Sequence, residues 1–494
     1  MTHSRRLKFR PARWLCYLGL SIAILIPCFW QQRIQAGDLS SHIYNAWLVQ
    51  LIEQGRAGGL IVKTQTQNVL FDLMLSYLLR ATGADWAQRA AVSAVVLIFF
   101  WGAFSFVWSW SRRGDQRPPW HLASILAMLA FGWVYHMGLF NFYLSLGFSL
   151  AALAAARRRT VSSAIVAGLL LAAAFLGHAL PPAWAIFVEV YTWLGQRVRP
   201  RQRPLLAGGA IAVLIMGGFV MKLLLKGEWG PVHYLSFSGA EQIWTFGNRY
   251  LALAAILLAV WGIWLLHLLK FRGARRLVFD VRLQLCALNA AFVLVIPSVI
   301  DLPGAARVSL LITRMSLAGA ILFCGLAASA PAPKWLAAAT GTLAVVFFTF
   351  TYQDEAALNR IETRMERAVR ELPPGSRVVT SLVDTNLRMF SLAHIIDRAC
   401  IGRCFSYANY EPSTGVFRVR AERPNAVVVA SLRDSWAMQV GGYTVKPEDL
   451  PMYRLDLCEP HRDGFCAVPV KSGEILQRTW LRLSPGFWQQ EKGL

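Results

Sequence analysis

Apolar residues occur in this chain in long runs separated by short polar stretches. A run of about 18 or more apolar residues is typical of a membrane-spanning helix, which must cross about 30 Å of hydrocarbon. Runs near that length recur at about 14–30, 86–110, 120–135, 137–156, 161–177, 182–196, 205–225, 250–270, 282–300, 308–329 and 334–350. The pattern predicts a polytopic α-helical membrane protein with about eleven spans.

The short loops between these runs differ in charge on the two sides of the predicted membrane. With the N-terminus in the cytoplasm, the basic loops RRGDQR, RRR, QRVRPRQR and KFRGARR all lie inside. The opposite loops, at 135–138, 177–182 and 301–306, carry few basic residues, as the positive-inside rule expects. The first run has the layout of a signal peptide or a first membrane helix, and we interpret it as an uncleaved helix because many spans follow.

The long polar stretch at 31–85 is predicted to be an external loop with two helices of its own. The first helical pattern covers 41–54, with Ile43, Trp47 and Leu51 on an apolar face and His42 and Asn45 on the other side. The second, NVLFDLMLSYLLRATG at 68–83, is too short for a comfortable span. The first pattern favours a helix that lies in the membrane interface, and the second favours a re-entrant or interfacial helix.

The last part of the chain is hydrophilic and is predicted to form a separate domain. An odd number of spans places it outside, in the periplasm of a bacterial-type inner membrane or in the extracellular space. It starts with the charged helical stretch DEAALNRIETRMERAVREL, which the breaker PPG ends. The segments SRVVTSL and NAVVVASL are typical of strands. We therefore expect a transmembrane domain at 1–351 and a small external α/β domain at 352–494.

Composition and charge agree with a membrane protein. The chain is 56% hydrophobic, and its net charge of +23 comes from basic residues in the short loops, so nucleic acid is not an expected partner. Four cysteines, Cys400, Cys404, Cys458 and Cys466, fall in the hydrophilic segment, where an oxidising compartment favours two disulfides. Four cysteines allow three pairings, and a zinc site is the weaker alternative because the spacings are not those of paired zinc knuckles.

The stretch GDLSSH at 37–42 raises the question of function. Asp38 has the right position to cap the following helix, but Ser40 or Ser41 could do so alone. An ionised aspartate shielded from water at a membrane surface could instead accept a proton from a sugar hydroxyl. His42, one helical turn on, could orient that acid or contact a phosphate, although an interfacial histidine without such a role is the simpler interpretation.

Three further polar residues are candidates for the same external side. Arg307 and Arg314 are seven residues apart, which would place them on one helix face, and a guanidinium suits a lipid-linked phosphate. His178, in GHALPP, follows a predicted span and could line the same cleft. The sequence contains no H-E-x-x-H, Walker, G-x-S-x-G or D-x-D motif.

Together these segments resemble the GT-C superfamily of membrane glycosyltransferases. The resemblance is carried by GDLSSHIYNAWLVQLIEQG with Asp38, by NVLFDLMLSYLLRATGADWAQRAA and by GLFNFYLSLGFSL, and covers roughly the first 180 residues. It implies a polyprenyl-phosphate-linked sugar as donor, a glycan, lipid or protein as acceptor, and Asp38 as the catalytic carboxylate.

The chain departs from members of that superfamily that carry paired acids or D-x-D, so no cofactor is certain and a divalent metal stays an alternative. His42, His178, Arg307 and Arg314 are the residues expected to bind the substrate or its lipid phosphate. The rival interpretation is a non-enzymatic membrane scaffold, or a transporter, that uses an external domain to bind a partner.

Overall fold

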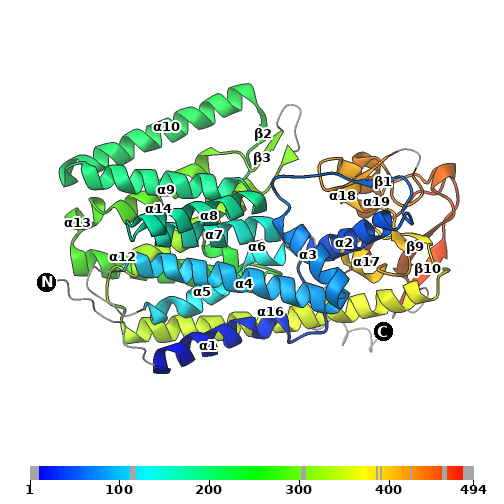
Figure 1. The fold of residues 1–494 in the computed structure, drawn as a ribbon, viewed down its shortest axis with the longest axis horizontal. Helices are drawn as coiled ribbons and strands as arrows, with labels where there is room; N and C mark the ends of the chain where they lie inside the picture. Colours follow the sequence, from blue (N-terminus) through cyan, green and yellow to red (C-terminus); the bar gives the residue numbers. More distant parts are fainter. Residues whose placement is uncertain are drawn as a thin grey trace.

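The computed structural model describes residues 11–111, 118–301, 307–384, 388–389, 392–422, 425–458 and 464–481. Helices make up most of it and run roughly parallel, and a smaller segment with strands lies at one end (Figure 1). The helices before residue 331 are α1 (Pro11–Leu25), α2 (Leu39–Glu53), α3 (Leu70–Thr82), α4 (Ala84–Ser109), α5 (Ala123–Ala130), α6 (Trp133–His136), α7 (Phe140–Ala156), α8 (Val161–Gly177), α9 (Leu180–Arg197), α10 (Arg203–Leu224), α11 (Val232–Ser236), α12 (Arg249–Arg272), α13 (Ala274–Val278), α14 (Val281–Val295) and α15 (Leu311–Ala327).

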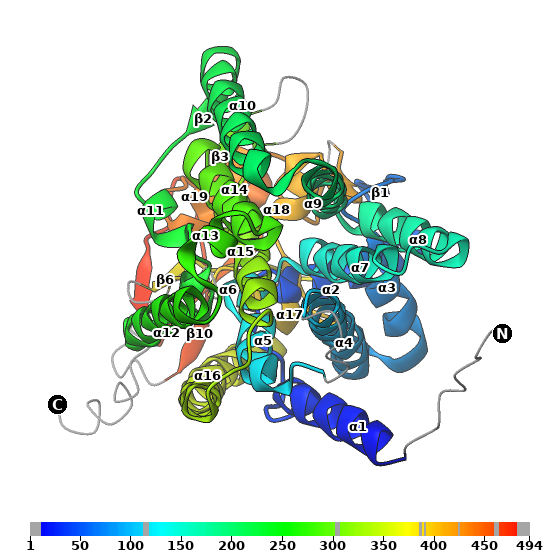
Figure 2. The same ribbon diagram turned by 90° about the vertical axis from the view of Figure 1, so that its left-hand side faces the viewer.

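Four helical segments in the described residues are long and apolar enough to cross a membrane: Ala84–Ser109, Pro200–Leu224, Arg249–Arg272 and Lys334–Arg370. Five shorter apolar helices accompany them: Trp14–Cys28, Phe140–Ala156, Val161–Gly177, Val281–Val295 and Leu311–Ala327. Figure 2 shows the bundle nearly end on, with α15 near its centre and α10 at its edge. On α10, Leu205 and Val213 are 76% and 71% exposed, an apolar surface compatible with contact to lipid.

The predicted span at 120–135 is not one helix. Helix α5 ends at Ala130, and α6 is a single turn that starts after Gly132. Gly132 has an extended backbone, and a β-carbon there would lie 2.9 Å from the carbonyl oxygen of Gln242. The helix breaks here because another segment packs directly against the glycine backbone.

The C-terminal segment follows α16 (Lys334–Arg370) and contains a four-stranded sheet in the order β10-β9-β5-β7. Strand β5 is parallel to both β9 and β7, and β9 and β10 are antiparallel. The elements are β5 (Arg377–Val379), β6 (Leu382–Asp384), α17 (Ile395–Ala399), β7 (Phe405–Ser406), α18 (Tyr410–Thr414), β8 (Val419–Ala421), α19 (Leu432–Val440), β9 (Met452–Leu457), β10 (Phe465–Pro469) and β11 (Thr479–Leu481).

One of the two predicted strands is present. SRVVTSL contains β5, whereas NAVVVASL forms no strand. In the second segment the side-chain oxygen of Asn425 accepts hydrogen bonds from the backbone N–H groups of Val427 and Val428. This local alternative competes with a strand ladder, so the apolar valines lie in an irregular stretch.

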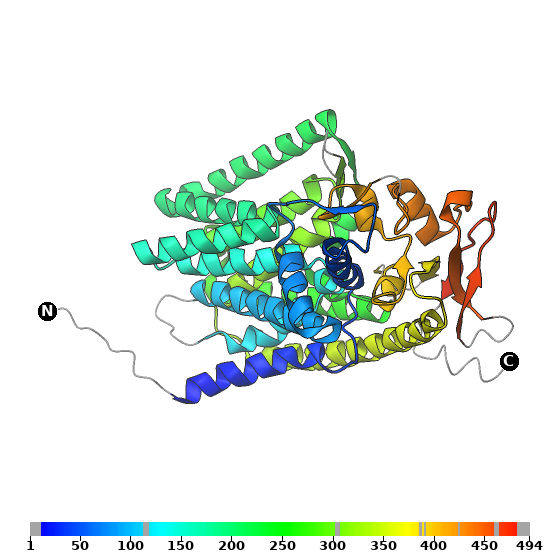
Figure 3. The same ribbon diagram turned by 45° about the vertical axis from the view of Figure 1, so that its right-hand side comes forward.

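Helix α16 joins the bundle to the C-terminal segment without a break, as Figure 3 shows along the lower side of the molecule. It is 37 residues long, so the domain boundary expected at 351 falls inside it. The two parts also share one apolar core, which contains Phe347 of α16 and Val378 of β5. In addition, β1 (Leu60–Val62) of the first loop pairs antiparallel with β8. The C-terminal segment is therefore packed onto the first loop and α16.

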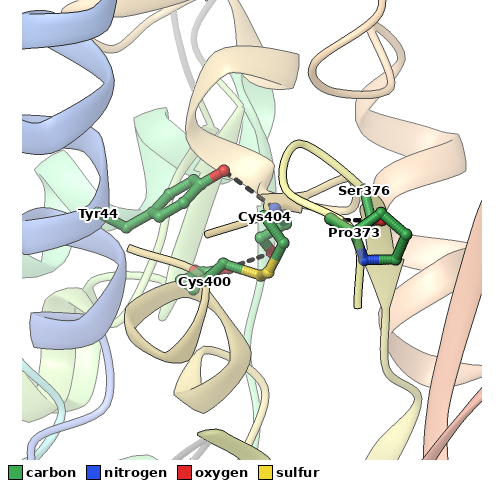
Figure 4. Close-up of a disulfide and its surroundings, with 7 residues drawn as sticks. Tyr44, Pro373, Ser376, Cys400 and Cys404 are labelled. Carbon is green, nitrogen blue, oxygen red and sulfur yellow. Dashed lines mark hydrogen bonds between the residues drawn. A yellow bond between two sulfur atoms is a disulfide. The ribbon is translucent and has the colours of Figure 1, made fainter. Parts of the chain in front are cut away.

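The four cysteines of this segment form two disulfides, as predicted, and the structure selects one pairing: Cys400–Cys404 and Cys458–Cys466. Figure 4 shows the first of them beside Tyr44 of α2. The hydroxyl of Tyr44 accepts a hydrogen bond of 2.9 Å from the backbone N–H of Ser406. The disulfide thus lies at the contact between α2 and the C-terminal segment.

Candidate functional site

The described residues enclose a cavity of about 1330 Å³ between one end of the helical bundle and the C-terminal segment. Its walls come from the N-terminal ends of α2, α7, α9 and α15, from the residue after α8, and from residues between β6 and α19. Of the residues predicted from the sequence, Asp38, His42, His178 and Arg314 line this cavity. Side chains from loops far apart in the sequence therefore meet in one place.

Asp38 occupies the N-cap position of α2, but its carboxylate makes no capping hydrogen bond. The prediction that Ser40 or Ser41 caps the helix is wrong, because α2 begins at Leu39 and both serines lie inside it. Ser41 instead donates a hydrogen bond of 3.1 Å to Glu411. The Asp38 carboxylate is therefore not used by the helix and faces the cavity.

The backbone at Asp38 is fixed by the turn between α6 and α7. The N–H groups of Gly37 and Asp38 donate to the carbonyl oxygens of His136 and Met137, at 2.7 and 3.0 Å. Gly138 has a φ of +80°, and a β-carbon there would lie 2.5 Å from the backbone nitrogen of Asp38. Only glycine fits this close approach, which holds the start of α2 against the bundle.

A histidine of the C-terminal segment stands beside Asp38. The Nε2 atom of His394 lies 3.6 Å from Oδ1 of Asp38, and its Nδ1 atom lies 3.4 Å from Oδ2 of Asp397. The ring of Tyr410 packs on the imidazole, with 5.0 Å between centroids. Among the described residues, His394 is therefore the basic side chain within ion-pair distance of Asp38.

His42 is held in a second polar cluster on the same cavity wall. Its Nδ1 atom lies 2.7 Å from Oδ1 of Asp72 and 3.8 Å from Oε1 of Glu411. Asn141 donates a 2.8 Å hydrogen bond to the other oxygen of Asp72. Most of α2 is buried between α3 and the C-terminal segment, so the expected polar face of an interfacial helix is here a buried contact.

Charges around His42 favour its protonated form. Burial opposes this form, but the carboxylates of Asp72, Glu411 and Asp38 outweigh burial and raise the pKa of His42 to about 10. Burial also raises the pKa of Glu411 to about 7, against the influence of His42. His42 is thus a cation in the cavity wall at neutral pH.

This cluster predicts a pH dependence of folding stability. The folded-state pKa of about 10 for His42 lies above the unfolded value of about 6.5, so protonation stabilises the folded state. The stabilisation is complete below the lower value and is lost as pH rises through the upper one. We expect the stability advantage of the wild type over His42→Gln to shrink between about pH 7 and pH 9.5, as measured by thermal unfolding in detergent. An advantage that is constant over this range would contradict the assignment.

Arg314 and His178 form a third group in the cavity. The Nη1 atom of Arg314 lies 3.1 Å from Nε2 of His178, while the backbone N–H of Leu180 donates to Nδ1 at 3.2 Å. Burial and the nearby Arg314 lower the pKa of His178 to about 3, so the ring is neutral. A neutral imidazole carries one N–H and has one acceptor nitrogen, so only one of these two contacts is a hydrogen bond.

Arg314 has unused hydrogen-bonding capacity. Its Nε atom is buried and has no hydrogen-bond partner among the described residues, and no carboxylate in that part of the chain forms an ion pair with it. The ring of Phe142 lies 5.8 Å below its guanidinium. A guanidinium that lines a cavity and forms no ion pair with a carboxylate is suited to bind an anion there.

Arg307 does not belong to the helix that carries Arg314. Its backbone belongs to β4 (Arg307–Val308), its side chain lies outside the described residues, and α15 starts only at Leu311 after the left-handed Leu310. The prediction that Arg307 and Arg314 share one helix face is therefore wrong. A seven-residue spacing places side chains on one face only where the helix is continuous.

The sequence did not single out the residues that surround the predicted ones. His394, Tyr410, Glu411 and Arg388 all come from the C-terminal segment and line the cavity or contact its lining. Arg388 donates to the carbonyl oxygens of Glu241 and Trp244, at 2.7 and 2.8 Å. Among the described residues, no group of three or more His, Cys, Asp or Glu side chains is arranged to hold a metal ion.

Comparison with protein-family models, with curated proteins and with solved structures found no match to this chain.

Proposed function

We propose that this protein is a membrane glycosyltransferase that moves a sugar from a polyprenyl-phosphate carrier to an acceptor hydroxyl, with inversion at the anomeric carbon. The observation that carries the proposal is the meeting of Asp38 and Arg314 in one cavity. The carboxylate of Asp38 can act as a base, and the guanidinium of Arg314 can bind a phosphate. A displacement at a lipid-linked sugar needs both functions.

In the proposed reaction, the hydroxyl oxygen of the acceptor attacks the anomeric carbon of the sugar. Asp38 accepts the proton of that hydroxyl at the same time. The bond between that carbon and the phosphate oxygen breaks, and the lipid phosphate leaves with the electron pair. Arg314 stabilises the negative charge on the leaving phosphate, and neutral His178 can donate one hydrogen bond to it. A single displacement from the opposite side inverts the anomeric centre.

The cavity walls also suit the lipid part of the donor. Apolar side chains of both the bundle and the C-terminal segment line it, including Leu139, Phe142, Leu310, Phe417 and Leu432. Such a wall can bury the first isoprene units while the phosphate reaches Arg314.

We place the cavity on the external face of a bacterial-type inner membrane, with the N-terminus in the cytoplasm and about eleven crossings in total. The basic loops support this orientation, and the two disulfides support an oxidising compartment for the C-terminal segment. The cavity lining comes from one end of the helices, which favours an enzyme over a carrier that must open to both sides.

The proposal is tested with the purified protein in lipid nanodiscs. The donors are undecaprenyl-phosphate-linked [14C]glucose, mannose and arabinose, and the acceptors are a membrane-glycan extract and water. Release of undecaprenyl phosphate is measured with and without EDTA, which also tests the metal requirement, and the product anomer is read by NMR. If none of the three donors is turned over or bound, the proposed function is wrong.

Arg314→Gln is expected to weaken donor binding by about 10- to 100-fold, because a hydrogen bond to a charged group contributes about 1.5–3 kcal/mol. Binding of undecaprenyl phosphate, followed by tryptophan fluorescence, measures this directly. Arg197→Gln is the matched control, since Arg197 ends α9 and lies over the ring of Trp193. Equal affinities for the wild type and Arg314→Gln would remove Arg314 from the phosphate site.

A further inference from the structure

The carboxylate proposed to act as base has its described ion-pair partner on a different part of the chain. Asp38 belongs to the first loop, whereas His394 precedes α17 in the C-terminal segment, 3.6 Å away. Asp38 makes no helix-capping bond that would fix its side chain. Its orientation toward the cavity therefore depends on the side chains beside it, and His394 is an ionisable group within ion-pair distance.

The imidazole of His394 is itself held from several sides. Asp397 lies behind it with 3.4 Å between Oδ2 and Nδ1, and Tyr410 packs against its ring. Asp397 is 2% exposed and also accepts a hydrogen bond from Ser406. The imidazole of His394 thus lies between the carboxylates of Asp38 and Asp397. Of these two carboxylates, that of Asp397 is anchored to β7.

Helix α17 is in turn fixed to the bundle. Arg398, the residue after Asp397, donates to both oxygens of Glu362 on α16 at 2.6 Å each. The same guanidinium donates to the carbonyl oxygen of Ile34 and to Gln88. The position of His394 relative to Asp38 is thus determined by contacts to α16, to α4 and to the segment that leads into α2.

We propose that His394 is the positioning residue for Asp38, so that docking of the C-terminal segment completes the catalytic site. This inference rests on the proposed function, in which Asp38 is the base. An imidazole 3.6 Å from one oxygen of Asp38 restricts the orientation of that carboxylate and leaves the other oxygen for the acceptor hydroxyl. The C-terminal segment is on this account part of the active site and not only a binding domain.

The surroundings of His394 favour a positive charge on it. Burial opposes protonation, but Asp397, Asp38 and Glu411 together outweigh burial and raise the pKa of His394 above its ordinary value. Tyr410 is the other titratable group against the ring. Burial raises the pKa of its phenol well above the ordinary value, so it stays neutral. The groups that face His394 are thus three carboxylates and a neutral phenol.

The first experiment uses transfer activity. His394→Gln is expected to lower kcat about 10- to 100-fold with little change in the donor KM. A loss of this size is typical when a side chain that orients a functional side chain is removed. Added imidazole should restore part of the rate of His394→Ala. His267→Gln, with its ring against the carbonyl oxygen of Pro331, is the matched control.

The second experiment needs no activity. Deuterium exchange at the C2 position of histidine, followed by mass spectrometry, gives the pKa of His394 in the tryptic peptide MFSLAHIIDR, which contains a single histidine. In Asp38→Asn this pKa should fall, whereas in the control Asp85→Asn it should not change.

The outcomes separate the two proposals. An active wild type with an unaffected His394→Gln variant overturns the role of His394 but leaves the glycosyltransferase assignment intact. A wild type that turns over no donor removes the proposed function, and the exchange experiment then still decides whether His394 and Asp38 form a charge pair. An unchanged pKa of His394 in Asp38→Asn overturns the pairing itself.

Discussion

Asp38→Asn is expected to lower kcat for sugar transfer by about 10²- to 10⁴-fold, the range that a positioned general base contributes. The amide keeps the size of the side chain but has no basic oxygen to accept the hydroxyl proton. The backbone hydrogen bonds of Gly37 to His136 and of Asp38 to Met137 do not involve the carboxylate, so the start of α2 should stay in place. Donor affinity is therefore expected to change much less than kcat.

The measurement compares kcat and KM for the wild type, Asp38→Asn and Asp38→Glu in the same nanodiscs. Asp38→Glu should retain more activity than the amide, because a carboxylate is still present. Asp85→Asn is the control, since Asp85 is an exposed acid in the first turn of α4. Full transfer by Asp38→Asn would show that Asp38 is not the base.

Hydropathy predicted the helical bundle well where a run of apolar residues is uninterrupted. The runs at 86–110, 205–225 and 250–270 correspond to helices α4, α10 and α12. It did not predict the break at Gly132, because the break depends on close packing by the segment around Gln242, more than a hundred residues later. It also separated 334–350 from the charged stretch after it, although the backbone continues as one helix, since α-helical geometry does not require an apolar environment.

The candidate site was predicted in outline because topology alone brings alternate loops to one side of a membrane. Asp38 and His178 follow apolar runs and Arg314 lies near the start of one, all on the same predicted side, and the three line one cavity. Their partners could not be predicted in this way. His394 and Glu411 reach the cavity through the packing of the C-terminal segment on α2, and no local pattern in the sequence specifies that contact.

The second large effect is expected at Glu362, which is fully buried in α16. Its carboxylate accepts two hydrogen bonds from Arg398, and Arg33 lies 3.7 Å from it. Glu362→Ala leaves the buried guanidinium of Arg398 without its carboxylate, and the loss of one partner of a buried ion pair costs about 3–5 kcal/mol. We expect a loss of that size in the free energy of unfolding, measured by denaturant titration in detergent.

Two comparisons separate the cost of an unpaired charge from the loss of packing. The double variant Glu362→Leu with Arg398→Met removes both charges and should be clearly more stable than Glu362→Ala, because no buried charge remains unpaired. Glu53→Gln breaks the exposed pair with Arg80 and should change the free energy of unfolding by at most about 1 kcal/mol. If Glu362→Ala were no more destabilising than Glu53→Gln, Arg398 would not anchor α17, and the path from α16 through α17 to His394 and Asp38 would lose its support.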